Sequence, residues 1–415
     1  MKILLLTPQF PYPPHQGTTL RNFNLIKGLA RRHRLRLFSL LAPGDAPAGT
    51  PVTDLVEHLV TAEQPRRSMA RRLRDLVSTP LPDMALRLWD PRNFDTLLEH
   101  CRAHPPDVLQ IEAIEMAPYL FGLLAAGVRP PRIVYDAHNA ETLLQRRAFL
   151  ADVRRPRRWV GAVYSAIQTL KLRRYERRLL RSVDAAAAVS EADAAELRSM
   201  APDLPLAIVP NGVDLSAYDP RHPYPNPYGR SGPNLVFTGK MDFRPNVDAA
   251  LWFADRVLPL LHASNLGPHF WIVGKSPHPR LRRLRNRPDI TITGAVPDIQ
   301  PYLAHADLFV APLLAGGGTR LKILEAMAMQ KPVVSTRLGA DGFPVQDGVQ
   351  LALADTPARF AARCLELLQH PERAAELARR GHAFVTAHYG WEKIIPGLET
   401  LYSSNDTLTG ASDRR

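Results

Sequence analysis

Short apolar runs alternate along the chain with longer stretches whose apolar residues recur every three or four positions. The short runs predict β-strands at residues 2–6, 35–41, 108–111, 132–135, 185–189, 207–209, 234–238, 270–273, 290–292, 308–311 and 332–335. The longer stretches predict helices at residues 18–32, from about 191, and at 247–261, 320–329 and 391–402. Regular alternation of strand and helix predicts parallel sheets covered by helices, which is the α/β class.

The alternation is interrupted between residues 218 and 233, where Pro, Gly, Asn and Tyr are frequent and no periodicity is visible. A chain of 415 residues exceeds one typical core, so the interruption predicts two doubly wound domains. We expect an N-terminal Rossmann-like domain at 1–212, a linker at 213–233, a C-terminal Rossmann-like domain at 234–388, a helix crossing back at 389–402 and a disordered tail at 403–415. Ligands of such sheets bind beyond the carboxyl ends of the strands, so the cleft between the domains is the expected site.

Composition and the absence of targeting signals favour a cytoplasmic protein. The two cysteines, Cys101 and Cys364, lie far apart and outside any CxxC pattern, which argues against a zinc site and fits a reducing compartment. The N-terminal apolar run ends at Pro8 and is too short for a signal peptide. No stretch approaches the roughly 18 apolar residues that a membrane span needs.

The net charge of +13 requires an anionic partner or a solvated basic surface. Residues 142–182 hold twelve Lys and Arg against two acids, and much of this charge lies in a predicted helix at 159–181. Its apolar positions recur at helical intervals: Val160, Val163, Tyr164, Ile167, Leu170, Leu172, Tyr175, Leu179 and Leu180. A basic amphipathic helix is typical of an anionic membrane surface, although a solvated face in an arginine-rich chain explains it equally well.

A second basic cluster has the same character: Arg66, Arg67, Arg71, Arg72 and Arg74. No recognised nucleic-acid-binding module accompanies either cluster, so nucleic acid is not an expected partner. The expected location is therefore the cytoplasm, with peripheral attachment to the inner face of the cytoplasmic membrane.

A glycine-rich segment joins a predicted strand to a helix: Gly316, Gly317, Gly318 and Thr319. Such a loop lets the backbone approach a ligand, and its N–H groups with the helix N-terminus favour an anion. Arg320 and Lys322 oppose the helix dipole in the first turn, which makes sense if a phosphate binds nearby. Glu325 could accept hydrogen bonds from sugar hydroxyls. The alternative is a plain glycine loop before a solvated helix start, because a glycine run alone is a weak signal.

Residues 316–334 resemble the donor-site signature of glycosyltransferase family 4, and so do residues 135–141, 209–214, 237–242 and 292–296. The resemblance implies a retaining enzyme of the GT-B fold, in which two Rossmann-like doubly wound domains face each other across a cleft. The overall pattern is similar to sugar transferases found with exopolysaccharide and PEP-CTERM sorting systems in Gram-negative bacteria.

The resemblance implies a role for each matching residue on the donor side. Glu325 matches the second glutamate of the family's E-x7-E motif, which binds ribose hydroxyls. The first glutamate would fall at Gly317, so the backbone amides of Gly317 and Gly318 are the expected substitutes. Gly239, Gly294 and Ala295 fall in further matching segments and are expected at the donor.

The family's basic pair for the diphosphate is only half present. Lys240 takes the arginine position, whereas Asn246 stands at the usual lysine position. Arg244 or Lys322 is expected to supply the missing charge. The nucleoside diphosphate leaving group becomes more negative in the transition state, so a cationic clamp is chemically necessary.

Two further residues match the family in the N-terminal half. His138 matches the active-site histidine near the transferred sugar, although a histidine that caps a strand or helix is the plainer interpretation. Gly17 matches a flexible glycine loop at the donor phosphates and acceptor, and its alternative is a simple helix entry. Asp136 and Asp242 are expected to face the cleft, but nothing resembles a DxD metal site, so neither a metal nor another cofactor is expected.

The leading hypothesis is retaining transfer of a sugar from a nucleoside diphosphate sugar to a glycan or lipid-linked acceptor. A non-catalytic nucleotide-sugar-binding scaffold is the second, since the first glutamate is missing. A GT-B nucleotide-sugar epimerase is the third, and it would require additional carboxylates in the cleft. The pattern does not identify the sugar, the base or the acceptor.

Overall fold

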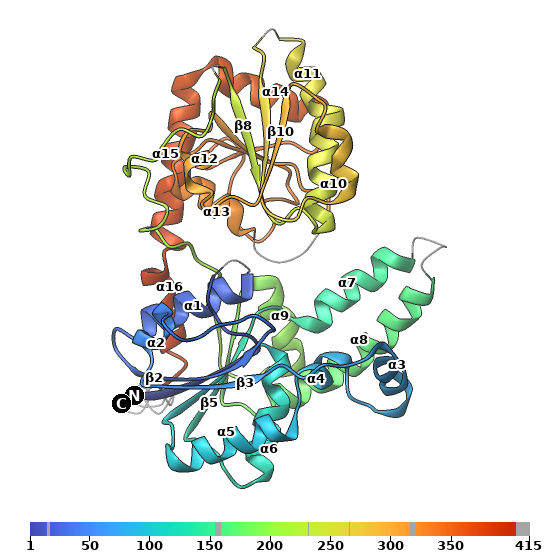
Figure 1. Cartoon of the computed structure of the whole chain (residues 1–415), viewed down its shortest axis with the longest axis vertical. Helices are drawn as coiled ribbons and strands as arrows, with labels where there is room; N and C mark the ends of the chain where they lie inside the picture. The colour runs from blue at the N-terminus through green and yellow to red at the C-terminus, as the bar shows by residue number, and fades with distance from the viewer. Residues whose placement is uncertain (15–16, 154–158, 231, 265, 316–319, 404–415) are drawn as a thin grey trace, which may run out of the picture. The chain divides into compact units, whose positions relative to one another are not determined.

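The computed structural model describes residues 1–14, 17–153, 159–230, 232–264, 266–315 and 320–403 (Figure 1). It divides into two compact units: Met1–Pro210 with Ile394–Arg415, and Asn211–Lys393. Each unit is built around one parallel sheet.

The sheet of the first unit has the order β3 (His58–Glu63), β2 (Arg34–Leu41), β1 (Lys2–Thr7), β4 (Val108–Glu112), β5 (Arg132–Ala137), β6 (Ala185–Ala188) and β7 (Leu206–Ile208). Every neighbouring pair is parallel. The strand order reverses between β1 and β4, and the loops that leave such a switch point diverge to opposite faces of the sheet. Binding residues are therefore expected at the carboxyl ends of these strands.

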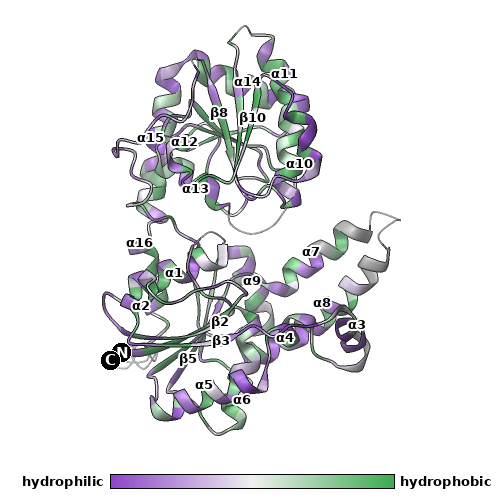
Figure 2. Cartoon of the chain, in the orientation of Figure 1, coloured by the Kyte–Doolittle hydropathy of each residue, from purple (hydrophilic) through white to green (hydrophobic). Residues whose placement is uncertain are grey.

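Helices cover both faces of this sheet: α1 (Gly17–Leu29), α2 (Pro51–Leu55), α3 (Met69–Ser78), α4 (Asp83–Arg87), α5 (Pro91–Ala103), η1 (Ile114–Met116), α6 (Ala117–Ala125), α7 (Glu141–Val153), α8 (Trp159–Leu180) and α9 (Glu191–Met200). One face packs Leu109, Ile111 and Tyr135 against Tyr119 of α6 and Leu179 of α8. Figure 2 shows this arrangement as hydrophobic strands beneath helices of mixed polarity.

The last helix, α16 (Trp391–Glu399), enters the first unit at Ile394. It packs on α1 so closely that a Cβ at Gly28 would lie 1.7 Å from Cδ1 of Ile395. Arg132 of β5 donates to the carbonyl oxygen of Leu401 at 2.9 Å. The C-terminal segment is thus an integral layer of the first unit.

The sheet of the second unit has the order β10 (Ile290–Gly294), β9 (His269–Val273), β8 (Asn234–Thr238), β11 (Leu308–Ala311), β12 (Val333–Ser335) and β13 (Ala352–Leu353). Its helices are α10 (Arg244–Trp252), η3 (Phe253–Val257), α11 (Leu258–His262), η4 (Pro279–Leu284), α12 (Gln300–Ala304), α13 (Leu321–Ala328), α14 (Pro357–Gln369) and α15 (Pro371–His388). Rings of Phe253, Phe270 and Phe360 meet in the core, with centroids 4.5 and 5.8 Å from that of Phe253. Its strand order also reverses, between β8 and β11.

The predicted strands are confirmed, with ends that differ by one or two residues. Two edge strands, β3 and β13, escaped prediction because β3 is only partly buried and β13 has two residues. The helix predicted at 247–261 consists of α10, the π-helical turn η3 and α11. Pro259 lacks the N–H that would continue the regular ladder, which accounts for the irregular turn before it.

Residues 213–233, predicted as a linker, are counted with the second unit. Val213 and Tyr228 are buried in its core, and the Tyr228 hydroxyl donates to the carbonyl oxygen of Tyr302 at 2.5 Å. The segment has no regular periodicity because it packs along the surface of the second unit as an irregular chain. The predicted disordered tail lies outside the described residues from 404 onward.

The basic helix predicted at 159–181 is α8. Leu172, Tyr175, Leu179 and Leu180 of its apolar set are buried in the core of the first unit, so they do not form an exposed apolar face. Within the described part of the chain, no helix combines the length and the hydropathy that a bilayer crossing requires.

Candidate functional site

Polar residues gather at the carboxyl ends of β4 and β5 in the first unit. Gln110 and Glu112 lie on the same face of β4 because side chains alternate along a strand. The parallel register pairs Glu112 with Asp136 of β5, and His138 follows two residues later. Arg21 reaches the same place from α1.

Arg21 and Asp136 form a buried bidentate ion pair. The guanidinium donates to the two carboxylate oxygens at 2.8 and 2.7 Å, and the side chains are 1% and 0% exposed. Burial alone would raise the pKa of Asp136, but the Arg21 charge outweighs it and holds that pKa below its ordinary value. Asp136 is therefore not open to solvent or ligand, and the expectation that it faces a cleft is wrong.

Glu112 holds the ring of His138. Its Oε2 lies 2.9 Å from His138 Nε2, and its Oε1 accepts a hydrogen bond from Gln110. Burial, and then the negative charge of Asp136, raise the pKa of Glu112 to about 7, while His138 and Arg21 act in the opposite direction. Because Glu112 occupies Nε2, Nδ1 is the ring nitrogen that remains for a ligand.

Two further carboxylates hold the loop that carries His138. Asp193 of α9 accepts a hydrogen bond from the N–H of Ala140 at 2.8 Å. Glu176 of α8 accepts from the N–H groups of Glu141 and Thr142 at 3.1 and 3.2 Å. The start of α7 is thus already capped by a protein carboxylate and is not available to a phosphate.

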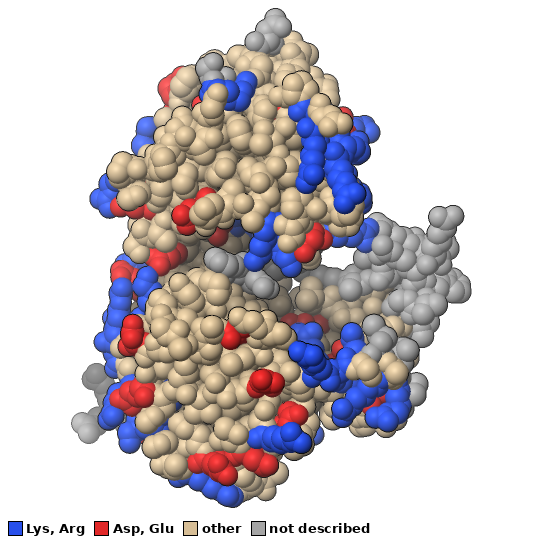
Figure 3. All heavy atoms as spheres, in the orientation of Figure 1, with Lys and Arg blue, Asp and Glu red and all other residues tan. Residues whose placement is uncertain are grey.

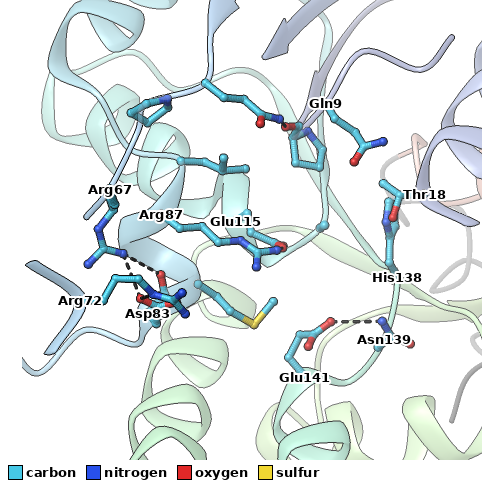
Figure 4. A pocket seen from close by; sticks show the side chains of 16 residues that line it. Gln9, Thr18, Arg67, Arg72, Asp83, Arg87, Glu115, His138, Asn139 and Glu141 are labelled. Carbon is cyan, nitrogen blue, oxygen red and sulfur yellow. Dashed lines mark hydrogen bonds and ion pairs between the residues drawn. The ribbon is translucent and has the colours of Figure 1, made fainter. Parts of the chain in front are cut away.

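His138 lines a pocket of about 630 Å³ that lies entirely within the first unit (Figure 4). Asn139 and Glu141 line it beside His138, and Gln9 and Glu115 line it from other loops. Burial, and then the charge of Glu115, raise the pKa of Glu141 to about 7. The pocket therefore offers amide and carboxyl groups next to an imidazole.

The arginines that line the pocket are paired with acids. Arg67 donates to Asp75 at 2.6 Å and to Asp83 at 3.0 Å, and Arg72 also pairs with Asp83. Arg87 pairs with Glu115. Of the basic cluster predicted at residues 66–74, Arg67 and Arg72 are thus paired with acids at the pocket.

Among the described residues, one group has the ligand atoms for a metal ion: Glu112, Asp136 and His138, whose atoms lie within 4.8 Å of one another. Arg21 takes both oxygens of Asp136 and places a permanent positive charge beside the group. The arrangement therefore fits a hydrogen-bonded charge cluster better than a cation site.

In the second unit, Lys322 points back from the start of α13 to the end of β8. Its Nζ donates to Oδ1 of Asn246 at 2.7 Å and lies 4.3 Å from the ring centroid of Phe237. A Cβ on Gly239 would lie 2.7 Å from that Nζ, and the φ of Gly239 is +151°. Glycine is thus required for the lysine to occupy this position.

Asn246 occupies the position where the family usually has a lysine, and Lys322 places its ammonium group beside it. Burial lowers its pKa to about 7, and the charge of Glu325 opposes that shift. In the described part of the chain, no carboxylate lies within ion-pair distance of its Nζ.

Lys240 and Arg244 lie in the loop after β8 and the first turn of α10. Lys240 pairs with Asp242 at 3.3 Å, and Arg244 pairs with Asp248 at 3.4 Å. Lys240, Asp242 and Arg244 are exposed, and Asp248 is half-buried. These cations are accessible to a ligand and are held only by surface pairs.

Glu325 lies one turn after Lys322 on α13. Burial raises its pKa, and a hydrogen bond with Tyr218 and the charge of Lys322 oppose that rise. Tyr218 comes from the irregular segment before β8, which is how that segment contributes to the predicted donor site.

The other predicted site residues are dispersed among loops. Gly17 is exposed at the start of α1, Gly294 ends β10 with a φ of +73°, and Ala295 follows it in an exposed position. Arg320 precedes the first turn of α13. The glycine-rich residues lie outside the described part of the chain: Gly316, Gly317, Gly318 and Thr319.

The sequence reasoning missed Arg21, Gln110, Glu112 and Glu176 as supports of His138. One signal was visible: Gln110 and Glu112 are polar residues two positions apart at the end of an apolar strand. The partner from α1 carries no comparable signal, because Arg21 is separated from Asp136 by 115 residues.

Comparison with known proteins identifies the class. A model described as "Glycosyltransferase Family 4" matches residues 16–217, and one described as "Glycosyl transferases group 1" matches residues 232–370. HepE of Anabaena, solved in complex with UDP and glucose, superposes with a TM-score of 0.65 at 17% identity, over 97% of this chain and 100% of HepE. Two parallel sheets, with every strand except β1 inside a matched glycosyltransferase region, define a two-domain α/β glycosyltransferase fold.

Curated relatives are similar over shorter stretches. An uncharacterized 44.6 kDa protein in the cps region of Klebsiella pneumoniae is 25% identical over 173 residues, 40% of this chain and 45% of that protein. Phosphatidyl-myo-inositol mannosyltransferase of Mycolicibacterium smegmatis is 28% identical over 210 residues, 49% of this chain and 52% of that protein. The matches thus span about half the length of these two relatives. The chain belongs to the family 4-like glycosyltransferases of the GT-B fold.

Proposed function

We propose that the protein transfers a sugar, with retention of configuration, from a nucleoside diphosphate sugar to a glycan or lipid-linked acceptor. One observation carries the proposal: Lys322 lies partly buried at a strand end with an amide, not a carboxylate, as its partner. A cation in that position is costly unless an anion arrives, and a diphosphate is such an anion. HepE, a structural neighbour, binds UDP.

On the donor side, Lys322 and Lys240 are proposed to hold the diphosphate. Their charges stabilise the leaving nucleoside diphosphate as its negative charge increases. Glu325 is proposed to bind the ribose hydroxyls. A leaving phosphate oxygen then serves as the base for the acceptor hydroxyl, so the mechanism needs no carboxylate nucleophile.

On the acceptor side, the pocket beside His138 is the proposed binding site. Its arginines are paired with acids, and it also offers the amides of Gln9, Gln64 and Asn139 and the carboxyl of Glu141, whose pKa is raised to about 7. Such a lining suits the many hydroxyls of a sugar. We propose a role in exopolysaccharide or other cell-surface polysaccharide synthesis, and the cps-region relative supports this proposal.

Peripheral attachment to the cytoplasmic face of the membrane is also proposed. Leu144 and Leu150 of α7 and Leu170 of α8 are 38, 52 and 64% exposed. Exposed arginines accompany them on α8, Arg173, Arg174 and Arg178, and Arg181 follows the helix. Figure 3 shows basic and acidic side chains interspersed over much of the visible face of the first unit. Exposed leucines beside arginines favour an anionic bilayer.

The test combines ligand binding with transfer. Thermal shifts are measured with UDP-, GDP- and dTDP-sugars, because a ligand of the native state raises the apparent Tm. Label from the stabilising nucleotide sugar is then followed into a membrane fraction. Lys322→Met should abolish both signals, whereas Arg285→Met, which removes an exposed cation of the second unit, should leave them unchanged.

Each alternative has its own outcome. Binding without transfer would instead support a non-catalytic scaffold. This alternative rests on Gly317, which stands where the family's first glutamate is expected. Conversion of the free nucleotide sugar would support an epimerase. No stabilisation by any nucleotide sugar would contradict the proposal.

A further inference from the structure

We propose that Glu112 is a positioning residue, whose buried carboxylate keeps the proton of the His138 ring on Nε2 and presents unprotonated Nδ1 to the pocket. Only the kinetic part of this inference rests on the proposed glycosyl transfer. The position of the ring proton is a property of the protein alone.

The geometry leaves one acceptor for the ring nitrogen. Glu112 Oε2 lies 2.9 Å from Nε2 of His138, and the carboxylate is 0% exposed. Asp136 lies beside it in register, but both of its oxygens accept from Arg21. A carboxylate facing Nε2 requires a proton on that nitrogen, just as a buried aspartate fixes the imidazole of a catalytic triad.

Glu112 is itself held by a chain of hydrogen bonds. The hydroxyl of Tyr402 donates to Oε1 of Gln110, and Nε2 of Gln110 donates to Oε1 of Glu112. A hydroxyl has one donor and an amide NH₂ has no acceptor, so the direction of each bond in the chain is fixed. Glu112 consequently has one oxygen committed to Gln110 and the other to His138.

Charged and titratable groups face Glu112 from every packed element: Asp136 of β5, Arg21 of α1, Tyr402 after α16 and His138 itself. The Arg21–Asp136 pair is internally balanced, so an ionised Glu112 beside a singly protonated His138 gives the cluster one net negative charge. With Nδ1 unprotonated, His138 can accept a hydrogen bond from a hydroxyl in the pocket. This orients an acceptor hydroxyl.

The first readout is spectroscopic and needs no substrate. Two-bond ¹H–¹⁵N correlations of ¹⁵N-histidine-labelled protein distinguish the two tautomers, and His138→Asn identifies the resonance. In the wild type, His138 should show the Nε2-protonated pattern at pH 8. Glu112→Ala should convert it to a mixture. Glu112→Gln should convert it to the Nδ1-protonated pattern, because Gln110 holds the single remaining oxygen and the new amide NH₂ then donates to Nε2.

The second readout is kinetic. Glu112→Ala should lower kcat by ~10-fold or more with less than about a threefold change in the donor KM, because the donor is bound by other residues. Glu112→Gln should lower kcat at least as much and shift the acidic limb of the pH profile, because Nδ1 is then protonated and cannot accept from the acceptor hydroxyl. Tyr402→Phe, at the far end of the chain, should have a smaller effect in the same direction. Glu99→Ala, an exposed glutamate on α5, is the matched control.

Two results would overturn the inference: an Nδ1-protonated His138 in the wild type, or an unchanged tautomer in Glu112→Ala. If Glu112→Ala does not fold, Glu112→Gln and Tyr402→Phe carry the test, and unaltered pH profiles in both would refute it. If the wild type transfers no sugar, the proposed function is refuted. The tautomer measurement still tests the role of Glu112, because it needs no substrate.

Discussion

The charged residues at the carboxyl ends of the two sheets are satisfied in different ways. In the first unit, Arg21 and Asp136 neutralise each other without exposure, and Glu112 completes a closed network around His138. In the second unit, Lys240 and Arg244 make surface pairs, and Lys322 contacts the amide of Asn246 and the ring of Phe237.

The difference shows two ways of preparing a site. In the first unit, the hydrogen-bonded network holds the His138 ring in one orientation. Its charges are already paired with one another, so it does not attract a further ion. Cations without close carboxylates remain able to bind an anion, and the folded protein bears the cost of their desolvation until it arrives. The first arrangement suits a positioned imidazole, and the second suits a diphosphate.

Breaking the buried pair should have the largest effect. Arg21→Met leaves the Asp136 carboxylate buried and unpaired, so we expect the free energy of unfolding of the first unit to fall by about 3–5 kcal/mol. Urea denaturation followed by tryptophan fluorescence measures it. Arg21→Met with Asp136→Leu should recover most of the loss, because no unpaired charge remains. A loss below ~1 kcal/mol in Arg21→Met would contradict the closed-network interpretation.

The pH dependence of donor binding tests whether Lys322 of the second unit binds the diphosphate. Because burial lowers the pKa of Lys322 to about 7, the free protein loses this charge above pH 7. A bound diphosphate favours the charged form, so the donor Kd should weaken by up to ~10-fold per pH unit above 7.

Lys322→Arg is the matched variant, since arginine stays charged at every accessible pH. It should flatten the dependence between pH 7 and 9, whatever its affinity at pH 7. Isothermal titration calorimetry with the stabilising nucleotide sugar measures both proteins. An equal slope in wild type and Lys322→Arg would assign the titration to another group.

The surface pairs of the second unit should matter least for stability. Asp242→Ala removes the partner of Lys240, yet both side chains are more than two-fifths exposed. We expect the free energy of unfolding to change by less than about 1 kcal/mol, as is usual for exposed ion pairs. Thermal denaturation measures it, and a loss comparable with that of Arg21→Met would remove the distinction between the two units.

The sequence predicted most of the fold because buried parallel strands are nearly continuous apolar runs, as in Leu4–Leu6 and Val333–Ser335. It also predicted which segments lie at strand ends, because Asp136 directly follows the apolar run 132–135 and Lys240 lies two residues after the run 234–238. Partly buried β3 carries no comparable run and was missed.

The partners within the site could not be predicted, since they meet only in the folded chain. Lys322 and Asn246 are 76 residues apart, and either Arg244 or Lys322 could have replaced the missing lysine on sequence grounds. Glu112 carried a signal, two polar residues in an apolar strand, but nothing indicated His138 as its partner. Pairing across elements depends on register and helix placement, which local patterns do not contain.

The return of the last helix to α1 has a consequence for biosynthesis. During synthesis, residues Met1–Pro210 emerge from the ribosome long before Ile395, which covers Gly28, and Tyr402, which donates to Gln110. The second unit lies between these segments in the chain, so it can complete its fold while the first still has an uncovered apolar layer. The first unit, although it is synthesised first, therefore cannot complete its packing until residues 394–402 have emerged, and a shorter nascent chain leaves the surface of α1 around Gly28 uncovered.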